Sequence, residues 1–244
     1  MDIRPNTASA FWLVPIATTC LAMTLHAWAS PTGAPEELPA VQRFLSGENE
    51  PLQHYRAFRR LEASNGKFKK EAWLDAWTEV TATGFRFEIV REGGSAYVRD
   101  RVLKAALERE QAIWDGRPTG RSSLTAANYY FIAANPEPGG LMRVTVKPKR
   151  RDELLVDGAI ILTEQDGDLV RVEGHLSKSP SFWAGRVEVV RTYDRVDGVR
   201  VPVRTESVAH LKMAGASSFK MTYEYETING RRVGIPAVVA HHSP

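Results

Sequence analysis

The sequence predicts an α+β protein built on a long antiparallel β-meander with one substantial helix. Three observations support this fold class. Apolar and polar residues alternate strictly over 199–204 and 219–226, which is the period of a strand with one dry face. Short turns at Asp197-Gly198 and Asp166-Gly167 separate neighbouring strands. An amphipathic stretch from Tyr97 to Trp114 interrupts the strands and predicts the helix.

The composition is that of an ordinary globular protein. The 244 residues are 43% hydrophobic and 25% charged, with a formal charge of +3, and the chain is long enough for one core. This charge is well short of the basic footprint of a nucleic-acid binder. We therefore expect no nucleic-acid partner.

Residues 1–29 resemble a cleaved export signal. Arg4 supplies a positive charge, Phe11 to Leu25 is mostly apolar, and Ala27-Trp28-Ala29 forms a small-x-small cleavage site. The apolar stretch is shorter than the roughly 20 residues that a membrane span needs. We expect cleavage after Ala29 and a periplasmic mature protein.

The single cysteine, Cys20, lies within this segment. Thr19 precedes it, where lipoprotein signals usually carry Gly or Ala, so lipidation is not expected. The mature protein would then contain no disulfide, no thiolate metal site and no cysteine nucleophile.

A leader over residues 30–48 precedes the folded region. Leu38, Val41 and Phe44 have helical spacing and predict a short helix within it. Tyr55 to Leu61 fits a helix or a strand equally well. Strands are then expected over 72–80 and 85–89, joined by a turn at Thr83-Gly84.

The helix from Tyr97 to Trp114 has recognisable ends. Ser95 is the predicted N-cap, and Gly116-Arg117-Pro118 ends the helix. The predicted apolar stripe consists of Val98, Val102, Ala105, Ala106, Ala112 and Ile113. This stripe should face the sheet.

Beyond Ser122 the pattern is that of strands. They are expected over 129–134, 141–148, 154–163 and 169–176, before the hairpin around Asp197-Gly198. Residues 233–244 show no periodicity and read as a C-terminal tail.

Two registers are possible for the Asp197-Gly198 hairpin. A two-residue loop places Arg195 opposite Arg200, and like charges directly opposite each other are unfavourable. A three-residue loop with a left-handed Gly198 places Asp194 opposite Arg200, and we expect this register. The same loop at Asp166-Gly167 would align Leu162 with Val170 and Ile160 with Val172.

No catalytic, metal or cofactor motif is present. His175 and His210 lie on polar phases of their strands, as surface histidines do. No Gly-x-Ser-x-Gly, Walker or Rossmann pattern occurs. We therefore predict no enzyme, no metal and no cofactor. The basic run Lys147–Arg151 could meet phosphates or anionic lipid headgroups, and its simpler interpretation is a solvated loop.

The remaining signal is the abundance of large apolar residues on strand phases. They are Trp73, Trp77, Phe85, Phe87, Tyr129, Phe131, Phe219, Met221, Tyr223 and Tyr225. One interpretation is a sheet that simply packs on the helix. The other is a sheet too large for one helix to cover, whose uncovered part forms an apolar cavity for an acyl chain.

The order of these features resembles the LolA-like superfamily, which includes periplasmic lipoprotein carriers together with LolB-like and RseB-like domains. The most suggestive residues are Val170-Arg-Val-Glu-Gly174 with the segment from Ser177 to Trp183. They are followed by Tyr193-Asp-Arg-Val-Asp-Gly-Val-Arg-Val-Pro202, a hairpin pattern that is frequent in that group.

The resemblance implies an unclosed, strongly curved antiparallel half-barrel over residues 49–232, with helices on its concave side. It also implies a cavity for lipid acyl chains, without cofactor or catalysis. An arginine on the concave side would hold a lid closed, and Arg191 is the candidate. The implied ligand-binding residues are Trp77, Phe87, Arg191, Val201, Val203, Phe219, Met221, Tyr223 and Tyr225.

We therefore predict a monomeric, non-enzymatic carrier that holds a lipid or a lipoprotein acyl chain. Two other classes stay open. One is an envelope-stress sensor that uses the same fold to contact a partner protein. The other is a hydrolase, which needs a histidine and a carboxylate converging in one pocket.

Overall fold

The computed structural model describes residues 38–46, 50–116, 120–180, 184–211 and 215–234. The predicted export signal lies outside the described residues, as does residue 235 onwards of the predicted tail. In the described part of the chain, no helix is both long enough and apolar enough to cross a membrane.

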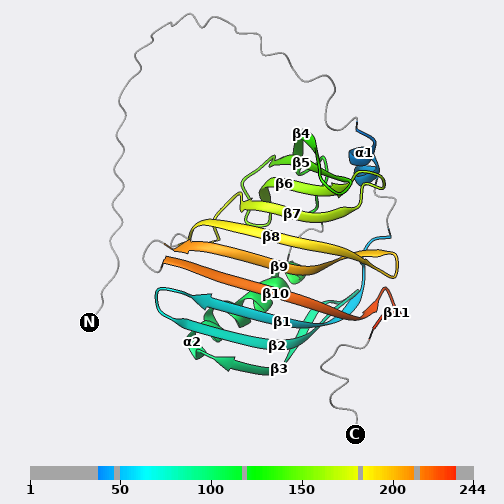
Figure 1. Ribbon diagram of the computed structural model, residues 1–244. Helices are drawn as coiled ribbons and strands as arrows, with labels where there is room; N and C mark the ends of the chain where they lie inside the picture. The colour runs from blue at the N-terminus through cyan, green and yellow to red at the C-terminus, as the bar shows by residue number, and fades with distance from the viewer. Residues whose placement is uncertain (1–37, 47–49, 117–119, 181–183, 212–214, 235–244) are drawn as a thin grey trace, which may run out of the picture. The chain divides into compact units, whose positions relative to one another are not determined.

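The elements follow the predicted order of early strands, a helix and a long series of strands (Figure 1). They are α1 (Pro39–Ser46), β1 (Tyr55–Asn65), β2 (Lys70–Thr81), β3 (Gly84–Gly94), α2 (Ala96–Val98), η2 (Arg99–Lys104), α3 (Ala105–Gly116), β4 (Tyr129–Glu137), β5 (Leu141–Pro148), β6 (Val156–Thr163), β7 (Leu169–Leu176), β8 (Ala184–Val196), β9 (Val199–Leu211), β10 (Gly215–Ile228) and β11 (Arg231–Arg232).

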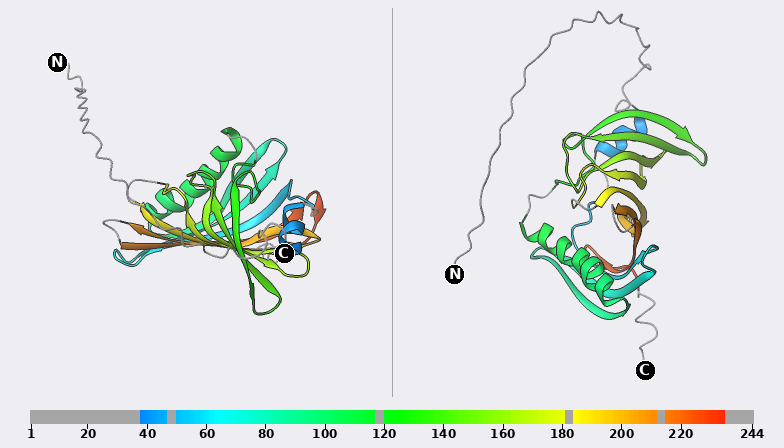
Figure 2. Two further views of the ribbon diagram at one scale, coloured as in Figure 1. Left: turned by 90° about the horizontal axis from the view of Figure 1, so that it is seen from above. Right: turned by 90° about the vertical axis from the view of Figure 1, so that its left-hand side faces the viewer.

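All the strands belong to one antiparallel sheet. Its order is β3-β2-β1-β10-β9-β8-β7-β6-β5-β4, with β11 paired to β10. The ends β3 and β4 do not pair with each other, so the sheet is open, and it bends around α3 (Figure 2). The predicted α+β fold, an unclosed and curved antiparallel sheet with helices on its concave side, is confirmed.

The segment that the sequence left undecided is strand β1. Its odd-numbered residues Ala57, Arg59, Leu61 and Ala63 are all buried, which is the alternation of a strand with one covered face. β1 pairs with β2 on one side and with β10 on the other. The first and last long strands thus lie side by side, although about 160 residues separate them in pairs such as Leu61 with Met221.

The predicted register of the β8–β9 hairpin is wrong. Asp197 and Gly198 both have positive φ, 51° and 81°, and form a two-residue turn that places Arg195 opposite Arg200. Such a turn matches the twist of the strands that it joins. The repulsion that argued against it is relieved by Asp168, whose carboxylate accepts from both guanidinium groups.

The predicted second hairpin is half right. Ile160 lies opposite Val172 as expected, but Leu162 lies opposite Leu169 rather than Val170, because the ladder shifts between Ile161 and Leu162. The loop is held by Thr163, whose carbonyl accepts from the Gly167 amide and whose hydroxyl accepts from the Asp168 amide. The two hairpins therefore use different turns.

The predicted helix is confirmed as the continuous segment α2–η2–α3, but its buried face differs from the prediction. Leu103 and Leu107 are buried, whereas Val102 is 39% exposed. One turn of π-helix, η2, widens the spacing so that Val98 and Leu103, five residues apart, are both buried. The Ser95 side chain makes no capping hydrogen bond; its carbonyl accepts from the Arg99 amide instead.

One row of paired residues runs across eight strands and defines the inner face of the sheet. From β2 to β5 it reads Leu74, Leu61, Met221, Thr205, Arg191, Val172, Ile160 and Val144. Two apolar cores lie along this face. One packs against Val98, Leu103 and Leu107 of the long helix, and the other packs against Val41 and Phe44 of α1.

Candidate functional site

The middle of the inner face, between the two cores, is incompletely covered. Its residues come from β8, β9 and β10, three neighbouring strands in the middle of the sheet order. Val203, Phe219, Met221 and Tyr223 are partly exposed, and Arg191 is exposed. We call these five residues the central strip.

The alternation of β10 explains why three members of the strip share one face. Phe219, Met221 and Tyr223 occur at every second position and all pack at the margin of the first core. Val203 joins them because it has the same phase on β9 as the buried residues Val201 and Thr205. Arg191 then pairs with Thr205 in the inner-face row.

The structure brings together most of the residues predicted to bind a ligand, in different environments. Val201 and Tyr225 are buried in the first core, and Phe87 packs against that core from β3. Tyr225 stacks on Tyr223, with ring centroids 6.1 Å apart, and its hydroxyl donates to the Pro202 carbonyl. Val201, Tyr225 and Phe87 thus belong to the first core, next to the strip, and not to the strip itself.

Trp77 is the exception among the predicted residues. On β2 the buried inner-face residues Ala76 and Thr78 flank it in sequence, so its side chain projects from the opposite face. There it packs edge-on against Phe58, with centroids 5.5 Å apart, and carries the Arg56 guanidinium over its ring. Trp77 therefore does not share the inner face with the other predicted ligand-binding residues.

Arg59 is a site residue that the sequence analysis missed. Its side chain is 1% exposed and lies on the inner face beneath the long helix. The guanidinium donates to both carboxylate oxygens of Glu110 on α3, at 2.6 and 3.1 Å, and also to the Tyr55 hydroxyl. It lies over the Tyr223 ring at 4.6 Å. Arg59 thus joins the sheet, the helix and the central strip.

Arg59 is therefore the inner-face arginine that is bonded to the long helix, and Arg191 is not. Among the described residues, Arg191 makes no hydrogen bond or ion pair with the helix, and its bonded neighbour is Tyr193. A sequence signal for Arg59 did exist. It occupies the apolar phase of Tyr55, Ala57, Leu61 and Ala63, and it was hidden because that segment could not be assigned to a strand.

The two arginines at the strip stay protonated, and the tyrosines around it stay neutral. Burial alone would lower the pKa of Arg59, but Glu110 outweighs burial, and the pKa of Arg59 is raised. Neighbouring tyrosine oxygens, first that of Tyr193, raise the pKa of Arg191. Burial raises the pKa values of Tyr55, Tyr223 and Tyr225, which keeps these phenols neutral.

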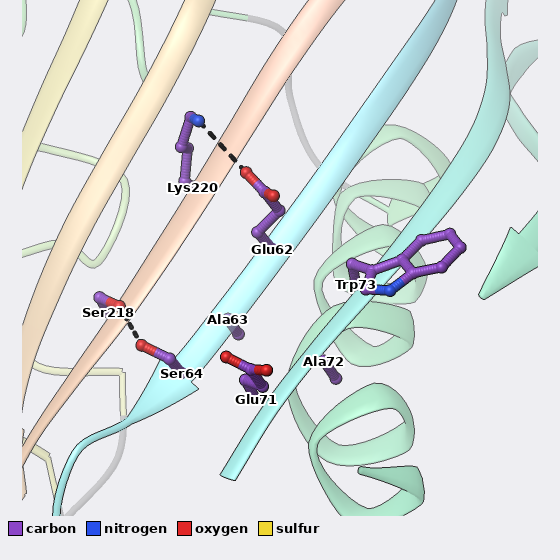
Figure 3. Close-up of a pocket in the computed structure, with 8 residues that line it drawn as sticks. All are labelled: Glu62, Ala63, Ser64, Glu71, Ala72, Trp73, Ser218 and Lys220. Atoms are coloured by element: carbon purple, nitrogen blue, oxygen red, sulfur yellow. Dashed lines mark hydrogen bonds and ion pairs between the residues drawn. The ribbon is translucent and has the colours of Figure 1, made fainter. Parts of the chain in front are cut away.

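Two hollows lie on the opposite, outer face of the sheet. The first, of about 360 Å³, is seen in Figure 3 in front of the strands, with the long helix behind them. Four of its polar side chains are paired with one another: Glu62 pairs with Lys220 at 3.2 Å, and the hydroxyls of Ser64 and Ser218 lie 2.7 Å apart. Trp73 forms part of its wall.

The second hollow, of about 420 Å³, bears on the hydrolase alternative. Asp157, His175 and Glu188 line it as successive cross-strand partners on β6, β7 and β8. Within the described residues no hydrogen bond joins the imidazole to either carboxylate, whereas a catalytic pair needs a contact of about 2.6–3.2 Å. The described chain also holds no group of three or more His, Cys, Asp or Glu side chains placed to bind a metal.

The sequence matches no protein-family model and no curated protein. Several solved structures are similar to it. A LolA superfamily protein from Nitrosomonas europaea is 8% identical, covers 81% of this chain and 96% of its own, and has a TM-score of 0.37. An outer membrane lipoprotein-sorting protein domain from Vibrio parahaemolyticus is 10% identical, with coverages of 80% and 94% and a TM-score of 0.39.

A DUF1329 family protein from Desulfovibrio piger is 9% identical, with coverages of 83% and 94% and a TM-score of 0.35. All three structures have low sequence identity to this chain and TM-scores below 0.5. The function of this chain is therefore inferred from its own geometry.

Proposed function

We propose that the protein is a non-enzymatic carrier that binds the acyl chain of a lipid or lipoprotein on the central strip. The observation that carries this proposal is the partial exposure of Phe219, Met221 and Tyr223 at the middle of the inner face. Large apolar side chains in such a position leave apolar area in contact with water. Covering that area with a chain is favourable by roughly 0.8 kcal/mol per buried methylene.

The polar surroundings of the strip suit such a ligand. Arg59 is already paired with Glu110, so the charge beneath the helix is satisfied without a ligand. The phenols of Tyr223 and Tyr225 stay neutral, and their rings offer flat apolar faces. An acyl chain needs no directed polar contact, which fits a strip with few polar groups along β10.

Export is part of the same proposal. Residues 1–29 would direct the chain to the periplasm, with removal after Ala29, because they combine Arg4, an apolar run and a small-x-small site. The mass of the protein isolated from the envelope tests this point. A chain that begins at Ser30 is expected, and a chain that keeps residues 1–29 would contradict it.

Titration with a fluorescent fatty acid tests acyl binding. We expect saturable binding by the wild-type protein, and a loss of about tenfold or more in affinity for Phe219→Ser combined with Met221→Ser. The matched control is Lys220→Ser, which changes the same strand on the outer face. Trp77→Leu should also bind normally, since Trp77 faces outward.

Two results would contradict the carrier proposal. One is the absence of saturable binding by wild-type protein. The other is equal weakening by the inner-face and outer-face variants when their melting temperatures match that of the wild type.

A further inference from the structure

Arg191 lies near the middle of the inner-face row. Val172 of β7 lies on one side of it and Thr205 of β9 on the other, and Met221 of β10 follows Thr205. Strands are about 4.8 Å apart, so the backbone of Arg191 lies roughly 10 Å from that of Met221. An arginine side chain can cover most of this distance. The Arg191 guanidinium is also near enough to Tyr223 for the two side chains to interact electrostatically.

Arg191 differs from the arginines around it in having no carboxylate partner among the described residues. Arg59 is paired with Glu110, while Arg195 and Arg200 share Asp168. Glu110 is the acidic group that faces Arg191 from the helix, and both of its oxygens accept hydrogen bonds from Arg59. The hydrogen bond of Arg191 goes to the side chain of Tyr193.

Arg191 is an exposed cation beside the apolar and aromatic side chains of the strip. An incoming group can therefore reach its guanidinium. Its planar fork matches the oxygens of a carboxylate or a phosphate and can bind either in a bidentate manner.

We propose that the central strip takes a long-chain amphiphile with an acidic head group, whose carboxylate or phosphate pairs with Arg191 while the chain lies along Phe219, Met221 and Tyr223. This inference rests on the proposed acyl-binding function and adds the class of ligand. Side chains on one face of a strand recur about every 6.8 Å, so these three residues offer roughly 14 Å of apolar track.

The test compares ligands that share one chain and differ in the head group. Sodium oleate, oleoyl lysophosphatidic acid and oleyl alcohol are titrated against wild-type protein, Arg191→Gln and Arg204→Gln. Arg204 lies on the next strand, is paired with Glu206 and points away from the strip, so its variant removes the same charge elsewhere. Arg191→Gln should weaken the acidic ligands tenfold or more and leave oleyl alcohol within twofold.

The outcomes separate this inference from the proposed function. If wild-type protein binds oleate and oleyl alcohol equally well, the acidic head group is overturned and acyl binding stands. If wild-type protein binds neither, both proposals fail. The wild-type preference is a readout that does not depend on the folding of the variant. If wild-type protein binds either acidic ligand more tightly than oleyl alcohol, the pairing with Arg191 is supported. The acidic ligand that binds more tightly identifies the anion.

Discussion

The charge pair between Arg59 and Glu110 is the most consequential residue-scale contact in the molecule. Arg59 is almost fully buried, whereas the Glu110 side chain is 30% exposed. The two partners therefore differ in what their removal leaves behind. Without Glu110, a guanidinium stays buried with no counter-charge, while without Arg59 the glutamate can be hydrated.

This asymmetry gives the first prediction. Glu110→Gln should lower the free energy of unfolding by about 3–5 kcal/mol, because it leaves the buried guanidinium without its carboxylate. The double variant Arg59→Met with Glu110→Gln should recover much of that loss, since an apolar side chain replaces the unpaired cation. Urea denaturation of the single and double variants measures both effects. A double variant less stable than Glu110→Gln would contradict the claim that the unpaired Arg59 charge causes the loss of stability.

Asp168 likewise neutralises arginine charge, at the point where the turns of two hairpins meet. It accepts from Arg195 and from Arg200, which directly oppose each other on β8 and β9. The hydrogen bond from Arg195, opposed in part by burial, lowers the pKa of Asp168. In the folded protein this carboxylate therefore binds its proton at a lower pH than in the unfolded chain.

The second prediction follows from the direction of that shift. A lowered pKa stabilises the fold fully above the unfolded value of about 3.9, and the stabilisation is lost as the pH falls through the folded pKa. Asp168→Asn should cost about 1 kcal/mol at neutral pH, and the difference from wild type should shrink below about pH 4. Denaturation curves over this range provide the test. A difference that does not change with pH would contradict the assigned role.

Individual side chains show how far the sequence could predict the site. The alternation of β10 correctly placed Phe219, Met221 and Tyr223 on one face, because that period depends only on neighbouring residues. Trp77 is misplaced because strand phase alone does not indicate which face of β2 is the inner one. The small residue Ala76 and the polar residue Thr78 occupy that face on β2.

At the scale of elements, the long helix shows the limit of periodicity as a guide. A regular helical period places Val98 and Val102 on one stripe, but the π-turn adds a residue and moves Leu103 into the core instead. No local sequence signal marks that turn. With this turn in place, Val98, Leu103 and Leu107 all pack in the first core.

The third prediction compares two adjacent residues of this helix. Leu103→Ala should lower the free energy of unfolding by about 2–5 kcal/mol, because it opens a cavity at a fully buried position. Val102→Ala should stay within about 0.5 kcal/mol of wild type, because Val102 is exposed. Thermal and urea unfolding of both variants measure the difference. A larger effect at Val102 would mean that the helix follows a regular period.

The β8–β9 hairpin shows a second limit of local reasoning. The repulsion between Arg195 and Arg200 was correctly identified, but the sequence could not indicate that Asp168, from another hairpin, would lie against both. A contact between two turns depends on how the strands are ordered in the sheet. Charge repulsion within one hairpin therefore predicts the three-residue loop, whereas the protein has the two-residue turn.

At the scale of the whole sheet, the antiparallel meander from β4 to β10 could be predicted because each strand pairs with its neighbour in sequence. The pairing of β1 with β10 could not, since it joins distant segments. This pairing places β10 well inside the sheet, next to Arg59 of β1. The central strip is thus a consequence of the sheet order and not of any local motif.

The central claim is that a fatty acyl chain lies on the inner face of β10. The most direct measurement uses single cysteines at 218, 219, 220 and 221 in a Cys20→Ser background, each labelled with a fluorophore and titrated with a nitroxide-bearing fatty acid. The labels at 219 and 221 should be quenched, and those at 218 and 220 should not, because neighbouring residues face opposite sides of the sheet. Saturable binding with equal quenching at all four positions, or with stronger quenching at 218 and 220, would contradict the account.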